Sequence, residues 1–460
     1  MRNVKPISRE RFSAFVSWTR SPIALDFGTE LDWYADTNER VLGAVVLDHT
    51  DRDFGYVILG RDEVGRFRAI DQRVSFPNEG MARSRLKQAL RQWSETGKSV
   101  FPQGDPGYRG VDLFTPIVAE EKQHPSFKLM GRHLNWTPAI GILSEMMKSF
   151  VDVDGNFVEQ FQSTGFDSRI WELYLYAYLV EDGLFVERPK PAPDFMVSRY
   201  GQQVFIEAVT VNPTDGEPLP GPKEGAPEMR GPEEIKELLK GKMPIKFGSA
   251  LYSKLSRKKP YWELPEVVGY PLVFAIADFH ESQSMTWSSS ALFEYLYGVT
   301  HEFTRDEDGR LVISALKIEQ HEHEGKKIPS GFFYLPGAEN VSAVLFSSSG
   351  TISKFNRMGR LAGFGVSNLK LIRHGVCHDH DPNAALPRPF VVEIEPGKCT
   401  ETWGEGLSLF HNPNARFPVP EAMFPSIAHH KFIDGRIRSI LPEFHPYTSM
   451  TLNLLIKDEQ

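Results

Sequence analysis

The most regular hydrophobic pattern of the chain lies in its middle third. Residues 167–180 are apolar nearly all round at helical spacing, which is typical of a buried helix. A short strand is expected at 184–187, and two apolar runs rich in β-branched residues follow at 195–197 and 204–211. The polar stretch 199–202 separates these two runs. The pattern therefore predicts a β-hairpin directly after the buried helix.

The segment after the hairpin predicts further alternation of helices and strands. Phe247, Leu251 and Leu255 recur at helical spacing and indicate an amphipathic helix. A buried strand, a helix ended by Gly298, a strand pair and a last core strand are then expected at residues 272–277, 290–297, around 311–318 and 341–346. This order is typical of a mixed α/β sandwich, which is the fold class we predict.

Three regions follow from the patterning. Residues 1–153 are expected to be an N-terminal α+β accessory or recognition domain, formed by an antiparallel β-meander and a helix. The meander strands are expected at 41–47, 56–59 and 66–70, and the helix at 82–94. Residues 154–349 are expected to be the α/β core. Residues 350–460, rich in proline, asparagine and aromatic residues, are expected to be a C-terminal extension packed on that core.

Composition narrows the class of protein without selecting a function. Hydrophobic residues make up 41% of the chain and aromatic residues 12%, which excludes general disorder. With only Cys377 and Cys399, no disulfide framework is expected. No signal-peptide pattern and no run long enough to span a bilayer is present, so we expect a cytoplasmic protein without a membrane partner. A net charge of −8 argues mildly against a nucleic-acid coat, although a nuclease needs only a local basic surface.

Three carboxylates interrupt the apolar elements in the middle of the chain. Glu172 lies inside the predicted buried helix, Asp194 follows Pro193 just before the first hairpin strand, and Glu207 lies within the second hairpin strand. An ionised carboxylate in such a place costs several kcal/mol unless it is paired or binds a metal. Hard divalent cations such as Mg²⁺ prefer oxygen ligands of this kind.

With a helix glutamate, Pro-Asp and a strand glutamate in this order, residues 166–211 resemble the PD-(D/E)xK nuclease superfamily. The order of elements extends the resemblance to about residue 346. The resemblance implies a restriction-endonuclease-like core and a metal-dependent nuclease that cuts DNA or RNA, for example in defence or repair. It also implies that Glu172, Asp194 and Glu207 bind Mg²⁺ or Mn²⁺ and that DNA is the first candidate partner, with a homodimer or a protein partner as further candidates.

One position departs from the family pattern. The lysine expected two residues after the strand acid is replaced by Val209. Either the cation comes from elsewhere, or the chain is a degenerate nucleic-acid or protein-binding module that retains only the fold. Lys254 on the next helix is the first candidate replacement and Lys246 the second; the alternative is that both are solvated cations on a helix face.

The same basic segment supplies the candidate contacts to substrate phosphate, namely Lys246, Arg257 and Lys258. The proline- and glycine-rich residues 212–232 are expected to form a loop beside the candidate site, where they could contact substrate. Farther on, Lys354, Asn356 and Arg357 could hold a phosphate or could form an ordinary polar turn.

A zinc-dependent hydrolase is the remaining alternative. Zinc accepts histidine, cysteine and carboxylate ligands. The candidate ligands are His321, His323, Glu324, His374, Cys377, His378, His380, Asp381, His429 and His430. None of these runs has the spacing of a known zinc motif such as His-Glu-x-x-His.

Overall fold

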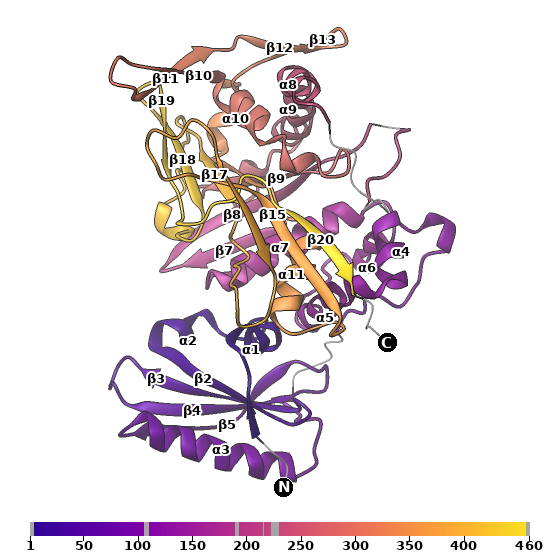
Figure 1. Cartoon of the computed structure of the whole chain (residues 1–460), viewed down its shortest axis with the longest axis vertical. Coiled ribbons are helices and arrows are strands. Elements are labelled where there is room, and N and C mark those ends of the chain that lie inside the picture. Colours follow the sequence, from indigo (N-terminus) through magenta and orange to yellow (C-terminus); the bar gives the residue numbers. More distant parts are fainter. Residues whose placement is uncertain (1–3, 105–109, 189–192, 215, 222–229, 457–460) are drawn as a thin grey trace.

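The structure is a computed structural model that describes residues 4–104, 110–188, 193–214, 216–221 and 230–456. Its fold is mixed α/β, and a long mixed sheet forms the centre of the larger body in Figure 1. From edge to edge, the strands are β19 (Arg436–Ile440), β18 (Ala428–Ile433), β17 (Leu407–His411), β14 (Ala343–Ser347), β9 (Leu272–Asp278), β8 (Gln202–Val211), β7 (Phe195–Arg199) and β6 (Phe185–Glu187).

The part of the sheet that contains the hairpin is antiparallel on one side and parallel on the other. Strands β6, β7 and β8 form an antiparallel meander. Strand β9 then pairs in parallel with β8, and β14 pairs in parallel with β9. A parallel neighbour requires a crossover, and the chain between β8 and β9 supplies it with α8 (Pro232–Lys240) and α9 (Lys242–Leu255). The predicted hairpin, crossover helix and buried strand are confirmed.

Two helices cover opposite faces of this part of the sheet. Ser168 of α7 (Phe166–Glu181) lies 3.0 Å from Thr210 of β8, oxygen to oxygen. Lys254 of α9 instead contacts Glu207 of the same strand. Because successive strand residues point to opposite faces, positions 207 and 210 face opposite sides. Helix α7 therefore covers one face and α9 the other.

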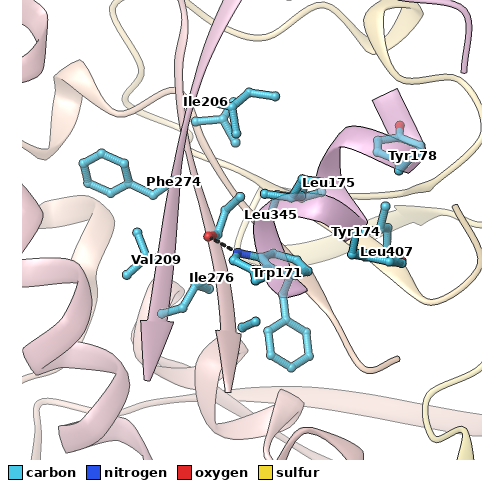
Figure 2. Packing of buried hydrophobic residues seen from close by; sticks show 14 of the residues in the cluster. Trp171, Tyr174, Leu175, Tyr178, Ile206, Val209, Phe274, Ile276, Leu345 and Leu407 are labelled. Carbon is cyan, nitrogen blue, oxygen red and sulfur yellow. Dashed lines mark hydrogen bonds between the residues drawn. The ribbon is translucent and has the colours of Figure 1, made fainter. Parts of the chain in front are cut away.

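The helix predicted to be buried is confirmed as the centre of the main hydrophobic core. Trp171, Tyr174 and Leu175 of α7 are fully buried. Figure 2 shows Trp171 and Leu175 packed among side chains of the sheet, with the Trp171 indole N–H donating a 2.8 Å hydrogen bond to the carbonyl of Ala275. A buried indole needs such a partner, since an unpaired N–H would cost about 1–3 kcal/mol. The bond fixes α7 against β9.

The N-terminal sheet lies at one end of the molecule (Figure 1). Its antiparallel strands are β1 (Val4–Pro6), β2 (Gly28–Asp36), β3 (Val41–Asp48), β4 (Phe54–Arg61) and β5 (Phe67–Phe76), covered by α3 (Glu79–Glu95). A Cβ atom at Gly43 would lie 2.6 Å from Leu86, so this glycine lets α3 approach the sheet closely. The predicted meander and helix are confirmed. Strands β1 and β2 were not predicted, because their polar residues interrupt the hydrophobic pattern of a strand.

Residues between this sheet and α7 pack into the main core. They form α4 (Pro125–Arg132), α5 (Thr137–Met146) and α6 (Phe157–Gln162). Phe127, Ile142 and Phe161 belong to the same cluster of buried residues as Trp171. The expected boundary at residue 153 therefore falls inside one hydrophobic cluster.

The C-terminal region contributes strands to the central sheet as well as covering it. Strand β17 pairs antiparallel with β14, and β18 and β19 continue the sheet to its edge. A separate sheet is formed by β16 (Arg388–Glu393), β15 (Leu369–Cys377) and β20 (Met450–Leu455). The extension predicted for residues 350–460 is thus part of the core architecture.

The other described helices and strands are α1 (Arg9–Val16), α2 (Pro22–Phe27), α10 (Ser289–Tyr297), α11 (Ile352–Leu361), β10 (Val299–Arg305), β11 (Leu311–Lys317), β12 (Gln320–His323) and β13 (Lys326–Pro329). Gly298 ends α10, as predicted, and adopts the left-handed region at φ 70°.

Within the described ranges, no helix is long and apolar enough to cross a membrane.

Candidate functional site

The hairpin places Asp194 and Glu207 side by side. Phe195 of β7 pairs with Ile206 of β8, so the next position of the antiparallel register sets Asp194 opposite Glu207. Oδ2 of Asp194 accepts a 2.7 Å hydrogen bond from the backbone N–H of Ala208. This bond fixes the aspartate against the strand that carries the glutamate, and the two acids predicted from the sequence are brought together.

Glu207 receives two hydrogen bonds on the same oxygen. Its Oε1 lies 2.8 Å from Nζ of Lys254 and 2.6 Å from the hydroxyl of Tyr261. Glu207 is 6% exposed and Tyr261 is 2% exposed, so both groups are shielded from water. No described residue is seen to donate to the second carboxylate oxygen, Oε2.

The local sequence explains why Lys254 reaches this strand. Phe247, Leu251 and Leu255 of α9 are buried and form the apolar stripe that the sequence predicts. Lys254 directly precedes the last of them, so its stem lies at the edge of the stripe while its ammonium group reaches Glu207. Val209, at the position where the family has lysine, is 3% exposed and packs in the main core. The cation beside Glu207 therefore comes from α9.

Glu172 has different partners from those expected. Its Oε1 lies 2.6 Å from Arg169 and its Oε2 lies 2.8 Å from Arg188. Glu172 is 5% exposed, and its ion pairs offset the cost of burying the charge. Both oxygens are engaged by arginines in this arrangement, so direct binding of a metal ion would require an arginine to release one of them.

Burial is the main cause of the raised pKa values around the hairpin. Burial, together with the nearby carboxylates of Glu207 and Glu172, raises the pKa of Asp194 to about 7. Burial also raises the pKa of Glu172, against the opposing effect of Arg169 and Arg188. Burial and the Glu207 carboxylate raise the pKa of Tyr261, so its hydroxyl keeps its proton and remains a hydrogen-bond donor.

The donor set fits a cation bound by two carboxylates better than one bound by three. Across the described ranges, no three His, Cys, Asp or Glu side chains are grouped so that they could hold a metal ion. Asp194 and Glu207 remain, and Mg²⁺ commonly uses one or two carboxylates with water and substrate phosphate completing its shell. The raised pKa of Asp194 supports this fit, because a cation beside it would stabilise the ionised form against burial and against the neighbouring carboxylates.

The predicted zinc ligands do not converge on one centre in the described chain. His321 bonds to Ser330 at 2.8 Å, and His429 bonds to His411 at 2.9 Å and to a backbone carbonyl. The rings of His378 and His380 lie edge to face, with centroids 4.7 Å apart.

The basic residues predicted to contact phosphate lie on and just after α9. Nζ of Lys246 donates to the carbonyl of Asn212 and to the hydroxyl of Thr214, both at 3.2 Å. The guanidinium of Arg257 lies 4.3 Å from the centroid of the Tyr261 ring. Lys258 is exposed. In the predicted substrate-contacting loop, residues 215 and 222–229 lie outside the described residues.

Sequence reasoning missed Tyr261, Arg169 and Arg188. Tyr261 follows Pro260 in a short apolar turn after α9, and a buried tyrosine hydroxyl usually has a hydrogen-bond partner. That rule could have marked Tyr261 as a residue with an unknown acceptor. Arg188 carries no comparable signal, because its pairing with Glu172 depends on the packing of α7 against the segment after β6. Arg169 lies three residues before Glu172 on the same helix, a spacing at which side chains meet, so this pair could have been predicted.

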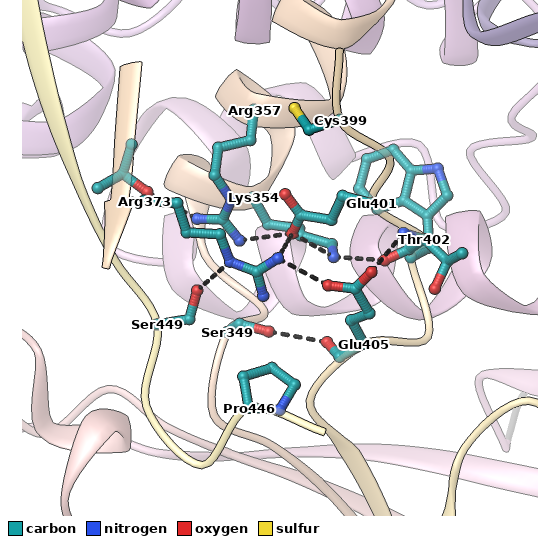
Figure 3. A network of polar contacts seen from close by, with 12 residues as sticks. Ser349, Lys354, Arg357, Arg373, Cys399, Glu401, Thr402, Glu405, Pro446 and Ser449 are labelled. Atoms are coloured by element: carbon teal, nitrogen blue, oxygen red, sulfur yellow. Dashed lines mark hydrogen bonds and ion pairs between the residues drawn. The ribbon is translucent and has the colours of Figure 1, made fainter. Parts of the chain in front are cut away.

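The segment around Lys354 forms a buried charged network instead of a phosphate site or a polar turn (Figure 3). It lies on α11, where Lys354 and Arg357 have no exposed surface. Glu401 lies 2.6 Å from Lys354 and accepts two 2.8 Å hydrogen bonds from Arg357. Arg373 lies 3.4 Å from Glu401 and 2.6 Å from Glu405. These cations are engaged by protein carboxylates inside the core.

Comparison of the chain with protein-family models, with curated proteins and with solved structures finds no match to any of them.

Proposed function

We propose that this chain is a metal-dependent nuclease, with Asp194 and Glu207 at its catalytic centre and DNA as its first candidate substrate. The observation that carries the proposal is the contact between Lys254 and Glu207, 2.8 Å long, beside an aspartate whose pKa is raised to about 7. Two acids and a lysine are the residue types that the resemblance to PD-(D/E)xK nucleases requires. The lysine reaches Glu207 from α9, although Val209 occupies the usual position.

The arrangement of elements supports the same proposal. A helix with a buried glutamate, an antiparallel meander, a crossover helix and a parallel strand follow one another as α7, β6, β7, β8, α9 and β9. This is the order expected of a restriction-endonuclease-like core. The acids lie on β8 and at the start of β7, where the resemblance places the metal-binding pair.

Each residue has a chemical task in the proposed reaction. A bound Mg²⁺ or Mn²⁺ would lower the pKa of a water molecule and offset charge on the scissile phosphate. Asp194 and Glu207 would hold the cation, and the ammonium of Lys254 would donate to the attacking water or to the charge developing on the phosphate. Glu172 would fix Arg169 and Arg188 behind the acids. Lys246, Arg257 and Lys258 would contact neighbouring phosphates.

The test is a cleavage assay with supercoiled plasmid, single-stranded circular DNA and structured RNA, each with Mg²⁺, Mn²⁺ or EDTA. The isosteric variants Asp194→Asn and Glu207→Gln are compared with Glu421→Gln, which changes an acid paired with Lys431 far along the chain. Metal-dependent cutting that both site variants lose and the control keeps would support the proposal. Equal cutting by all variants would reject it.

A second candidate is a binding module that has the fold without the catalysis. The burial of Val209 favours it, because the family position for lysine is occupied by a core side chain. This candidate predicts that nucleic acid binds equally well in EDTA and in Mg²⁺ and is never cut. Fluorescence anisotropy on the same substrates separates the two candidates.

A further inference from the structure

The two hydrogen bonds to Oε1 of Glu207 come from groups with different freedom to move. The side chain of Lys254 is 31% exposed and ends a flexible stem, whereas Tyr261 is 2% exposed. The Tyr261 ring packs against Phe274 with centroids 6.1 Å apart at 72°, and the Arg257 guanidinium covers it at 4.3 Å. The tyrosine is therefore held by packing on several sides, while the lysine can change its partner.

This difference bears on the task of the lysine in the proposed reaction. The contact with Glu207 uses one of the three N–H donors of the ammonium group, and it weakens when the group moves toward the attacking water or the phosphate. A buried carboxylate that loses its donor pays a desolvation cost and tends to turn toward another partner, unless a second donor holds it. Tyr261 is such a donor, 2.6 Å from the same oxygen.

We propose that Tyr261 is a positioning residue that keeps Oε1 of Glu207 in place, so that Oε2 would remain available to a metal ion and Lys254 would be free to act on the substrate. This inference rests on the proposed nuclease function and deepens it. It assigns two separate tasks to the two donors: Tyr261 fixes the metal ligand, and Lys254 takes part in the reaction.

Titration with Mn²⁺ tests the first task without any need for cleavage. Tyr261→Phe removes only the hydroxyl and is expected to raise the Kd for Mn²⁺ about tenfold. Lys254→Met is expected to leave that Kd unchanged or to lower it, because it removes a cation near the metal ion. In the Tyr261→Phe background, Lys254→Met is expected to raise the Kd instead, since Glu207 then has neither donor.

Kinetics tests the second task. Tyr261→Phe is expected to raise the Mn²⁺ concentration needed for half-maximal cutting and to recover most of kcat at saturating metal. Lys254→Met is expected to lower kcat even when metal is saturating. If Tyr261 only stabilised the fold, Tyr261→Phe would not change the Mn²⁺ requirement selectively while keeping kcat at saturating metal.

Tyr297→Phe is the matched control, because it removes a buried hydroxyl that donates a 2.9 Å hydrogen bond to the carbonyl of His411. It should lower Tm without changing the Kd for Mn²⁺. If wild-type protein binds Mn²⁺ and Tyr261→Phe binds it within a factor of two, the role of Tyr261 is rejected and the nuclease proposal stands. If wild-type protein does not bind Mn²⁺ at all, both are rejected.

Discussion

Two buried carboxylates of this molecule, Glu401 and Asp194, have pKa values shifted in opposite directions. Burial opposes ionisation of Glu401, but Arg357, Arg373 and Lys354 outweigh it and hold the pKa well below its usual range. At Asp194, burial acts together with two neighbouring acids and raises the pKa to about 7. Three cations outweigh burial at Glu401, whereas at Asp194 the N–H of Ala208 and the charge of Arg188 do not outweigh burial and the two acids.

The comparison separates a structural cluster of charges from a candidate functional one. The Glu401 network lies inside the protein and its acid is matched by cations, so it stabilises the packing of α11 against the C-terminal region. At the Asp194 cluster, Glu172 engages Arg169 and Arg188 and Glu207 engages Lys254, and among the described residues no cation is seen to pair directly with Asp194. Strained electrostatics of that kind is typical of sites that bind a cation or do chemistry.

The largest effect on stability is expected at the Glu401 network. Glu401→Gln removes the charge that pairs with three buried cations, and the loss of one partner of a buried pair costs about 3–5 kcal/mol. Urea unfolding measures this difference in the free energy of unfolding. Glu393→Gln, which breaks an exposed pair with Lys370, is the control and should change stability by less than about 1 kcal/mol. Equal effects of the two variants would contradict a structural role for the network.

The largest effect on activity is expected from the lysine of α9. Lys254→Met should lower kcat by about 10²-fold or more at saturating Mg²⁺, because it removes a donor near the developing charge. The measurement is plasmid cleavage under single-turnover conditions. Lys370→Met changes an exposed lysine and should have no effect. Unchanged kcat in Lys254→Met would mean that the cation beside Glu207 has no catalytic task.

A pH titration tests whether the pKa of Asp194 is raised in the folded protein. Its folded-state pKa of about 7 lies above the usual value of 3.8, so the folded protein binds a proton that the unfolded chain has released. The resulting stability is present at low pH and is lost as pH rises from about 4 through 7. In EDTA, the free energy of unfolding of wild-type protein should fall by about 2 kcal/mol between pH 5 and pH 8, relative to that of Asp194→Asn.

The quantity to measure is the difference in the free energy of unfolding between wild-type protein and Asp194→Asn, obtained by urea unfolding at several pH values. Burial also raises the pKa of Glu181 to about 7 and that of Asp182 to about 6, and both groups titrate equally in wild type and variant. Parallel pH curves for the two proteins would show that Asp194 carries no unfavourable charge.

A smaller effect is expected at Glu172. Glu172→Gln weakens its pairs with Arg169 and Arg188 and should lower stability by about 1–3 kcal/mol. It should change the Kd for Mn²⁺ by less than threefold (a difference of about 0.6 kcal/mol), because both oxygens already bind arginine. A tenfold rise in that Kd, measured by titration, would instead identify Glu172 as a direct ligand.

The smallest effect is expected from the exposed cations after α9. Lys258→Ala should weaken binding of DNA only a few-fold and reduce the slope of log K against log salt by about 1. Anisotropy titrations between low and moderate salt measure that slope. Lys398→Ala, which changes an exposed lysine paired with Glu395, should leave it unchanged.

Much of the region around the site could be predicted from sequence because its signals are local. Helix α7 is apolar on nearly every side, and α9 has a clear buried stripe. The hairpin of β7 and β8 consists of two apolar runs separated by a short polar turn. Hairpin register follows from the turn, so the proximity of Asp194 and Glu207 follows as well. The position of Lys254 followed from the packing of the crossover helix on the sheet.

The features that sequence reasoning missed depend on contacts between distant segments. The pairing of β17 with β14 joins strands separated by some sixty residues, and nothing local identifies the partner. Lys354 and Arg357 were expected in a phosphate site or an ordinary polar turn, and nothing local indicates their buried pairing with Glu401, which lies 47 and 44 residues away in sequence. Tyr261 and Arg188 were missed for the same reason, whereas Arg169 lies three residues from Glu172 on α7 and could have been predicted.

The measurement that tests the central claim most directly is the change in Tm on addition of Mn²⁺ to wild-type protein and to Asp194→Asn. A ligand that binds only the folded state at 100 times its Kd stabilises it by about 2.7 kcal/mol. The account predicts a clear rise in Tm for wild type and none for Asp194→Asn. Equal rises in both proteins, or no rise in either, would contradict a metal site formed by Asp194 and Glu207.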